Sequence, residues 1–405
     1  MMKVCVIGGG QAGFQVCESI INKGYKGKLT LISEEPFLPY QRPPLSKNFL
    51  SGKLKRDRLF LRSKEYYIDN GIELICEQRV DDIDLNKKQI CLSNNRDIIF
   101  DKLVFATGAK LKKLDNLGKT IDVHYLRSLN ESLILRESME KDRKIIIIGG
   151  GFIGLEIAAV CVERGLEVCM IEQESRLMKH AVPDDVSEFY KDYHAARGVK
   201  IFTNSIIKNI EKVKNDYYLQ LESGKKVHGH LLLAGIGVSP DIDLAKKLGI
   251  SCENGIKVDQ YGMTNIKDVY AVGDCANFFN TLLKKHIRPE SIQHCVDTAK
   301  VVAENILGNS FVYETVPWFW SDQYDLKLQI AAIGNEFERT QTIRYSQKSF
   351  STFCFNNDKH IATFSINRPA DIFISKKILS IGSMLTQAEV NKKDFDFKVF
   401  ARKYL

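Results

Sequence analysis

The stretch that decides the fold is Lys3-Val-Cys-Val-Ile-Gly-Gly-Gly-Gln-Ala-Gly13. Its apolar run over residues 3–7 is rich in β-branched side chains, which is typical of a buried strand in a parallel sheet. Gly8, Gly10 and Gly13 follow with the spacing G-x-G-x-x-G, and a helical pattern opens at Phe14. Such a turn lets the backbone approach a pyrophosphate, which the helix N-terminus can bind. The stretch therefore predicts a dinucleotide-binding βαβ unit.

The pattern occurs a second time in the middle of the chain. The apolar run 144–148 leads into residues 149–154, which repeat the glycine spacing and again open a helical pattern. Each unit continues into a second buried strand that ends in an acid, Glu34 in the first unit and Glu172 in the second. Such an acid would accept hydrogen bonds from the adenosine ribose, and its charge repels the 2′-phosphate of NADP. Glu172 therefore favours NAD, while the nearby Arg176 leaves NADP as the alternative.

Further buried strands extend both units. Residues 102–106 end at Thr-Gly, and residues 231–234 end at Gly-Ile-Gly. The run 268–272 ends at Gly-Asp and suits a return to the first unit, which would make the second unit an insertion. From Trp318 onward the pattern changes to alternating strands, followed by a short helix over residues 371–379. We predict two doubly wound dinucleotide-binding domains and a third, mostly β domain.

The composition is that of an ordinary globular protein. The chain has 405 residues with 44% hydrophobic and 27% charged side chains, which suits two or three domains. No apolar run is long enough to span a bilayer or to act as a secretory signal, so we expect a cytoplasmic protein. The ten cysteines show neither C-x-x-C nor a zinc spacing. We therefore expect inert buried thiols and no metal site.

The positive charge is concentrated in one segment. The net charge is +8, and residues 42–64 contain eight basic side chains and one acid, Asp57. A uniformly basic nucleic-acid-binding protein would not show this distribution. The pattern indicates a local basic face for an anionic ligand or partner.

Motifs in family order along nearly the whole chain resemble the NADH-dependent ferredoxin reductases that serve oxygenases, the type of putidaredoxin reductase and biphenyl dioxygenase reductase. These motifs are Pro39–Lys47, Ala106–Gly108, Gly149–Glu156, Gly235–Gly237, Val272–Asp274, Glu290–Gln293 and Pro317–Gln323. The resemblance implies a glutathione-reductase-like α/β fold. It places an FAD-binding domain over 1–112 and 238–317, an inserted NAD-binding domain over 113–237 and a C-terminal α+β domain over 318–405.

The resemblance also implies contacts to both cofactors. The residues expected at FAD are Gly8, Gly10, Ala12, Gly13, Glu34, Arg42, Lys47, Val80, Ala106, Thr107, Gly108, Arg127, Asp274 and Ile292. The residues expected at NAD are Gly149, Gly151, Ile153, Gly154, Glu156, Glu172, Gly235, Ile236 and Gly237. Within the first set, Asp274 matches an acid that binds the ribityl chain, and Ile292 matches a backbone contact to the isoalloxazine edge. The alternatives are that Asp274 is a turn residue and Ile292 a core residue.

Three residues are expected to be catalytic. Family geometry implies that Lys47 and Glu156 lie near flavin N5, where such a pair would orient the nicotinamide in a partly desolvated site. The alternatives are a structural ion pair, or for Glu156 a solvated helix face. Trp320 matches a residue that packs beside the isoalloxazine on the acceptor side, and its alternative is a core or interface aromatic.

Electrons are expected to leave the flavin toward an external acceptor. Disulfide reductases of this fold carry C-x4-C beside the flavin, whereas residues 39–47 contain no cysteine. With FAD and NADH as cofactors, the expected acceptor is an acidic two-iron two-sulfur ferredoxin that feeds a monooxygenase or dioxygenase. The alternatives are an NADH oxidase, a rubredoxin reductase, or a flavoprotein like apoptosis-inducing factor. We expect neither nucleic acid nor membrane as a partner, and residues 53–64 form either a ferredoxin-facing surface or a solvated face.

Overall fold

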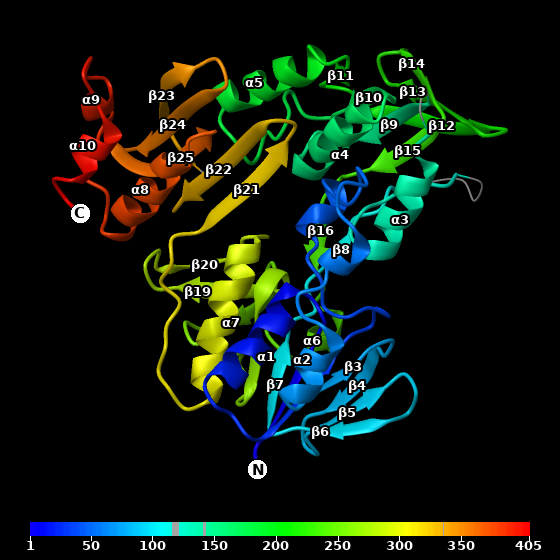
Figure 1. Ribbon diagram of the computed structural model, residues 1–405, viewed down its shortest axis with the longest axis vertical. Coiled ribbons are helices and arrows are strands. Elements are labelled where there is room, and N and C mark those ends of the chain that lie inside the picture. The colour runs from blue at the N-terminus through cyan, green and yellow to red at the C-terminus, as the bar shows by residue number, and fades with distance from the viewer. Residues whose placement is uncertain (116–120, 141–142, 335) are drawn as a thin grey trace. The chain divides into compact units, whose positions relative to one another are not determined.

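The computed structural model describes residues 1–115, 121–140, 143–334 and 336–405 (Figure 1). By its internal packing the chain forms two compact units, each assembled from three segments. The first unit contains Met1–Gln41, Phe60–Lys110 and Ser239–Phe319, and the second contains Arg42–Leu59, Leu111–Val238 and Trp320–Leu405. The boundaries of the three predicted domains stay a prediction.

The first unit is built on a parallel sheet with the strand order β18-β7-β1-β2-β3. These strands are β1 (Lys3–Ile7), β2 (Lys28–Ile32), β3 (Ile72–Ile75), β7 (Lys102–Phe105) and β18 (Val269–Ala271). The sheet is covered in part by α1 (Gln11–Asn22), which lies against α7 (Ile292–Ile306) (Figure 1). The last four residues of β1 are buried, because a sheet covered on its faces needs apolar side chains on both sides.

Smaller elements complete the first unit. Antiparallel strands β4 (Val80–Asp84), β5 (Gln89–Leu92) and β6 (Asp97–Ile99) form one small sheet. A second small sheet is mixed, with β17 (Ile256–Val258) parallel and β20 (Lys285–Ile287) antiparallel to β19 (Ala276–Asn280). The helices are α2 (Lys64–Asp69), α6 (Asp243–Lys247) and the 3-10 turn η3 (Gly273–Cys275). β8 (Ala109–Leu111) and β16 (Val238–Pro240), each of which contains residues of both units, pair as a two-stranded ribbon.

The second unit repeats the parallel arrangement. Its sheet has the order β11-β10-β9-β15, with β9 (Lys144–Ile148), β10 (Glu167–Ile171), β11 (Lys200–Phe202) and β15 (Leu231–Ala234). The helices α3 (Leu129–Ser138), α4 (Phe152–Glu163) and α5 (Asp184–Ala195) belong to this unit, as do the 3-10 turns η1 (Pro43–Ser46) and η2 (Arg56–Arg58). β12 (Ile207–Val213), β13 (Asp216–Leu221) and β14 (Lys226–Gly229) form an antiparallel sheet.

The C-terminal part of the second unit is a second five-stranded sheet, in the order β21-β22-β25-β24-β23. Its strands are β21 (Trp318–Gln323), β22 (Leu326–Ala332), β23 (Arg339–Ser346), β24 (Ser349–Asn356) and β25 (Lys359–Ile366), and the pairs from β22 to β23 in this order are antiparallel. The helices α8 (Pro369–Ser380), α9 (Gln387–Val390) and α10 (Phe397–Ala401) follow. The predicted fold class, two parallel α/β sheets with a C-terminal α+β part, is confirmed.

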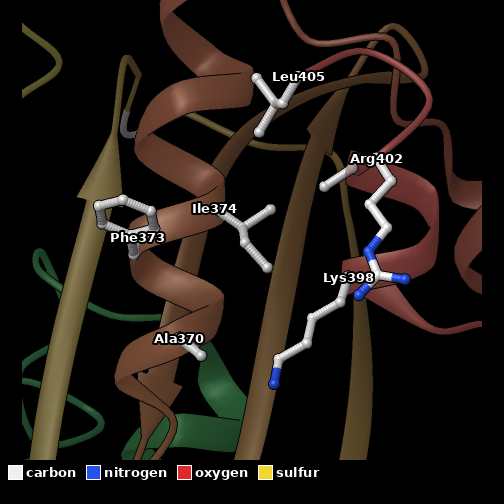
Figure 2. A pocket seen from close by; sticks show the side chains of 7 residues that line it. Ala370, Phe373, Ile374, Lys398, Arg402 and Leu405 are labelled. Atoms are coloured by element: carbon white, nitrogen blue, oxygen red, sulfur yellow. The ribbon is translucent and has the colours of Figure 1, made fainter.

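A groove opens between α8 and α10 (Figure 2). It is lined by Ala370, Phe373, Ile374, Lys398, Ala401, Arg402 and Leu405. None of the residues predicted for the cofactor sites lies in this lining. The groove is therefore separate in its residues from the sites described next.

Candidate dinucleotide sites and a buried carboxylate

The first glycine loop has a backbone that only glycine can follow. Gly8 has φ +118°, and a Cβ there would lie 2.1 Å from the Ala106 carbonyl oxygen. A Cβ at Gly13 would lie 2.0 Å from the Gly8 carbonyl oxygen. At Gly10, by contrast, nothing lies within 4 Å of the Cβ position. The loop is thus closed on its inner side and open on its outer side, which fits the close approach of a pyrophosphate.

The carboxyl edge of the first sheet gathers more of the residues predicted for FAD. Because β1, β7 and β18 are parallel neighbours, the turns after them meet at one edge. Thr107, after β7, donates from Oγ1 to the Asp241 carbonyl at 2.6 Å. Gly273, after β18, has its Cβ position 2.7 Å from the Ala12 Cβ, and its amide donates to Thr298 on α7. Asp274, the next residue, therefore lies close to the start of α1, whereas the contact of Ile292, the first residue of α7, with FAD stays a prediction.

Two further FAD candidates belong to the first unit. Glu34 follows β2, the parallel neighbour of β1, so it lies at the same carboxyl edge of the sheet, and its side chain is exposed. Val80 begins β4 and is 8% exposed within the unit's hydrophobic core. Val80 therefore has a packing role in the structure, and its contact with FAD stays a prediction.

The second glycine loop repeats the geometry of the first. Gly149 has φ +102°, and its Cβ position lies 2.5 Å from the Gly235 carbonyl oxygen. The Cβ position of Gly154 lies 2.2 Å from the Gly149 carbonyl oxygen, while nothing lies within 4 Å of Gly151. Ile153 is 42% exposed at the start of α4. These residues fit a second pyrophosphate.

The remaining NAD candidates lie at the carboxyl edge of the same sheet. Gly235, after β15, donates its amide to the Ile148 carbonyl at 2.8 Å, so Gly235, Ile236 and Gly237 adjoin the loop. Glu172, after β10, accepts from the Gly150 amide at 2.6 Å. It also accepts from the Glu174 amide at 2.8 Å, so its carboxylate is held beside the loop where a ribose would bind.

Arg176 is committed to the protein itself. Its Nε pairs with Asp184 at 2.7 Å, and its other nitrogens donate to the carbonyls of Val182 and Lys179 at 2.8 and 2.9 Å. A guanidinium used in this way has few donors left for a 2′-phosphate. The geometry thus weighs against the NADP alternative.

The predicted flavin-lining segment 42–47 contains the 3-10 turn η1. Arg42 donates from NH1 to the Arg127 carbonyl at 2.7 Å, which brings these two FAD candidates together. The adjoining helix α3 begins with a capping box, in which Ser128 and Glu131 satisfy each other's backbone amides. This cap fixes the chain at Arg127.

Glu156 is held by hydrogen bonds from three side chains. It lies in α4, two residues after Gly154, and is only 3% exposed. Its Oε2 accepts from Lys47 Nζ at 2.7 Å and from Ser46 Oγ at 2.5 Å, and its Oε1 accepts from Ser321 Oγ at 2.6 Å. The predicted Lys47–Glu156 pair is therefore present, and the solvated-face alternative for Glu156 is wrong.

Ser46 and Ser321 were not predicted as site residues. Ser46 directly precedes Lys47 in the motif, and this position could have indicated that it belongs to the site. Ser321 follows Trp320 on β21, where alternation directs the two side chains to opposite faces of the strand. Trp320 is half-buried, and its position beside the flavin stays a prediction.

The cysteines form no redox pair. All ten are free and lie within the described residues. Burial raises the pKa of the Cys161 thiol to about 12 and that of Cys169 to about 11, so both stay protonated. Electrons have no dithiol route among the described residues.

One group of side chains has the composition of a metal site. Asp216, His228 and His230 place their ligand atoms within 4.8 Å of one another. However, His230 Nδ1 accepts from the Lys144 amide at 2.8 Å, so a neutral His230 carries its proton on Nε2. That nitrogen then offers no lone pair to a cation, and we propose no metal here.

Comparison with known proteins agrees with this geometry. Residues 2–299 match the family described as pyridine nucleotide-disulphide oxidoreductase, and residues 318–401 match the reductase C-terminal family. The chain is 37% identical to rhodocoxin reductase of Rhodococcus erythropolis, over 98% of this chain and 94% of that protein. It is 32% identical to rubredoxin-NAD(+) reductase of Pseudomonas putida, over 91% of this chain and 96% of that protein.

A solved structure is equally similar. The ferredoxin reductase for the CYP199A2 system from Rhodopseudomonas palustris superimposes with a TM-score of 0.95 at 36% identity, covering 99% of this chain and 100% of that one. Among the described residues, no helix is long and apolar enough to cross a membrane. The chain belongs to the pyridine nucleotide-disulphide oxidoreductase family, as one of its NAD(P)H-dependent flavoprotein reductases of the ferredoxin and rubredoxin type.

Proposed function

We propose that this protein takes hydride from NADH onto bound FAD and passes single electrons to a two-iron two-sulfur ferredoxin that serves an oxygenase. The observation that carries the proposal is the pair of complete glycine loops, each closed inside and open outside, in a chain without a cysteine pair. When bound, FAD accepts a hydride and releases electrons singly. The three domains, with the boundaries 1–112 and 238–317, 113–237, and 318–405, are part of the same proposal.

The chain's own residues bind and orient the cofactors. The first loop, Glu34, Thr107 and Asp274 would hold FAD, and the second loop with Glu172 would hold NADH. Glu156, fixed by three donors, offers a carboxylate at the start of α4 to orient the nicotinamide. The Lys47 ammonium, with 16% of its side chain exposed, would stabilise negative charge that arrives with the hydride.

NADH is proposed over NADPH because the second loop carries an acid, and because the nearby Arg176 and Lys179 are already paired within the protein. Glu172 faces the loop, and Arg176 is committed to Asp184 and two carbonyls. Lys179 pairs with Glu174 at 2.6 Å. A 2′-phosphate would therefore meet repulsion without a compensating cation.

The acceptor is proposed to be an acidic ferredoxin that docks on part of segment 53–64. Lys53 pairs with Glu163 at 2.7 Å, and Arg62 pairs with Glu18 at 2.5 Å. Lys55, Arg56 and Arg58 are exposed. Reversing two of these charges should weaken an electrostatically steered encounter more at low salt than at high salt.

Anaerobic stopped-flow mixing with a two-iron two-sulfur ferredoxin tests the proposed acceptor. The NADH-reduced protein should transfer electrons to it faster than to a rubredoxin or to oxygen. The double variant Arg56→Glu/Arg58→Glu should raise the apparent KM for the ferredoxin, whereas Lys246→Glu/Lys247→Glu, with the same change in net charge on α6, should not. Faster transfer to rubredoxin would replace the ferredoxin with the alternative acceptor, and a rate no higher than that with oxygen would identify an oxidase.

A further inference from the structure

The Glu156 carboxylate is the end of a longer chain of hydrogen bonds. Ser321 Oγ donates to Glu156 Oε1 at 2.6 Å, and Gln323 Nε2 donates to Ser321 Oγ at 3.2 Å. Gln323 Oε1 lies 2.9 Å from His194 Nε2. His194 Nδ1 lies 3.4 Å from the Tyr324 hydroxyl. These hydrogen bonds connect α4, β21 and α5, three elements of the second unit that are distant in the sequence.

The hydrogen-bond chain that ends at Glu156 is enclosed in the protein. Glu156, Ser321, Gln323 and His194 are each at most 3% exposed. A hydrogen bond in such a dry place is stronger than in water, and a missing partner costs more. The side chains are therefore fixed relative to one another.

The protons along the chain all point toward the carboxylate. Burial lowers the pKa of His194 to about 4, so the imidazole is neutral at physiological pH. Because the Gln323 amide nitrogen donates to Ser321, its oxygen faces His194 and must accept from Nε2–H. His194 Nδ1 is then the acceptor for the Tyr324 hydroxyl. Each bond polarises the next in the same direction, which concentrates donor strength on Glu156.

We propose that Ser321, Gln323 and His194 are positioning residues that hold Glu156 in the orientation used for hydride transfer. This inference rests on the proposed function of Glu156 at the nicotinamide. The chain fixes and polarises the carboxylate and does not conduct protons, because an amide gives up its proton reluctantly. Glu156 is thereby held from both sides, by Ser46 and Lys47 on Oε2 and by the chain on Oε1.

The hydrogen-bond chain also fixes the position of strand β21. Its alternation places Ser321 and Gln323 on one face and Trp320 on the other. Anchoring the first face to Glu156 and His194 fixes the strand that carries Trp320. The same hydrogen bonds thus set the position of a residue proposed for the hydride side and of one proposed for the acceptor side.

The test compares Ser321→Ala with Ser321→Thr, which keeps the hydroxyl. The holoenzyme is mixed with NADH anaerobically without any protein acceptor, and FAD reduction is followed by absorbance. Ser321→Ala should slow this reduction about tenfold, the size expected for one lost bond to a charged group. Ser321→Thr should restore most of the rate. Ser187→Ala is the matched control. Ser187 is also buried, but its hydroxyl donates to the Leu177 carbonyl and takes no part in the hydrogen-bond chain that ends at Glu156.

A second readout does not depend on turnover. In protein labelled with ¹⁵N in its histidines, NMR should show His194 neutral with its proton on Nε2 at pH 6. Glu156→Gln should shift the His194 nitrogen signals although the two residues do not touch, and Ser187→Ala should leave them unchanged. The proposal would be overturned if Ser321→Ala reduced FAD at the wild-type rate, or if Glu156→Gln left the His194 nitrogen signals unchanged. Neither measurement includes a ferredoxin, so a wrong acceptor would appear only in the electron-transfer experiment.

Discussion

The two glycine loops of this protein have almost the same backbone but differ in what surrounds it. Gly8 and Gly149 share the left-handed conformation, with φ +118° and +102°, and each closes onto a carbonyl of a neighbouring parallel strand's turn. Gly13 and Gly154 close onto the first glycine of their own loops. Sheet order and glycine spacing thus set the shape of the binding loop in both places. The shape alone specifies a dinucleotide but no chemistry.

The two units differ in the side chain at an equivalent position of the helix that follows each loop. Gln15 and Glu156 both stand two residues after the last glycine of their loop. Gln15 is half-buried and bonds within its own helix, to Glu18 at 3.2 Å and Ser19 at 3.3 Å. Glu156 is buried and accepts hydrogen bonds from three side chains in two other segments. One exchanged side chain therefore separates a loop that only holds a cofactor from one that is expected to orient it.

Truncating each of these two side chains in turn should give the largest contrast. Glu156→Ala leaves the Lys47 ammonium without its partner in a mostly buried place, which should lower the free energy of unfolding by about 3 kcal/mol. It should also slow FAD reduction by NADH at least tenfold. Gln15→Ala should change stability by less than about 0.5 kcal/mol. Urea unfolding and stopped-flow absorbance measure the two effects, and equal behaviour of the variants would remove the proposed distinction between the loops.

Two glycines of the second loop should separate folding from binding. A Cβ at position 154 would meet the Gly149 carbonyl oxygen at 2.2 Å, so Gly154→Ala should cost about 2 kcal/mol of stability through overpacking. Gly151→Ala meets nothing within 4 Å and should unfold like the wild type. Its methyl group would occupy the space offered to the pyrophosphate and raise the Kd for NADH about tenfold. An unchanged Kd in Gly151→Ala would place the coenzyme elsewhere.

The sequence predicted the loops well because their geometry is local. Gly8, Gly149 and the acids Glu34 and Glu172 lie at spacings that the βαβ turn itself imposes, so composition and order were enough. The partners of Glu156 arise differently, since Ser321 lies 165 residues away and meets it only through tertiary packing. Strand alternation would have placed Ser321 and Gln323 on one face of β21, but nothing local names the carboxylate that this face meets.

The sequence also could not indicate which acceptors the Arg176 guanidinium contacts. Proximity to Glu172 along the chain suggested a base for a 2′-phosphate, whereas the side chain turns to Asp184 and to backbone carbonyls. An arginine has five donors, and which acceptors they meet depends on the path of the loop around it. Side-chain commitment of this kind follows from the fold and not from spacing.

Acid should destabilise both units through buried imidazoles: His294 in the first unit, and His194 and His360 in the second. Burial lowers the pKa of His294 in the first unit and of His194 in the second from 6.5 to about 4. Between these values the unfolded chain binds protons that the folded chain does not, so stability is full above pH 6.5 and falls as pH decreases toward 4. Each histidine contributes about 1.4 kcal/mol per pH unit.

Urea unfolding at pH 7 and pH 5.5 measures this dependence. His194→Gln and His294→Gln should each flatten it by the contribution of one proton, with the other histidine as its control. A pH dependence that neither substitution alters would mean that both imidazoles take up protons inside the fold. A change in only one variant would assign a contribution to that histidine and none to the other.

The smallest expected effect concerns the two acids that follow the loops. Glu172→Gln removes the charge and keeps one oxygen that can accept from the Gly150 amide, while the Glu174 amide loses its side-chain acceptor, so the loop should keep its fold at a small cost in stability. The ratio of kcat/KM for NADPH to that for NADH should rise about fivefold, or about 1 kcal/mol. A full reversal is not expected, because Arg176 stays bound to Asp184, and Arg176→Ala should leave the ratio unchanged. Glu34→Gln should leave it unchanged too and weaken FAD binding instead. If Glu34→Gln moved the coenzyme ratio and Glu172→Gln did not, the assignment of the two loops to their cofactors would have to be exchanged.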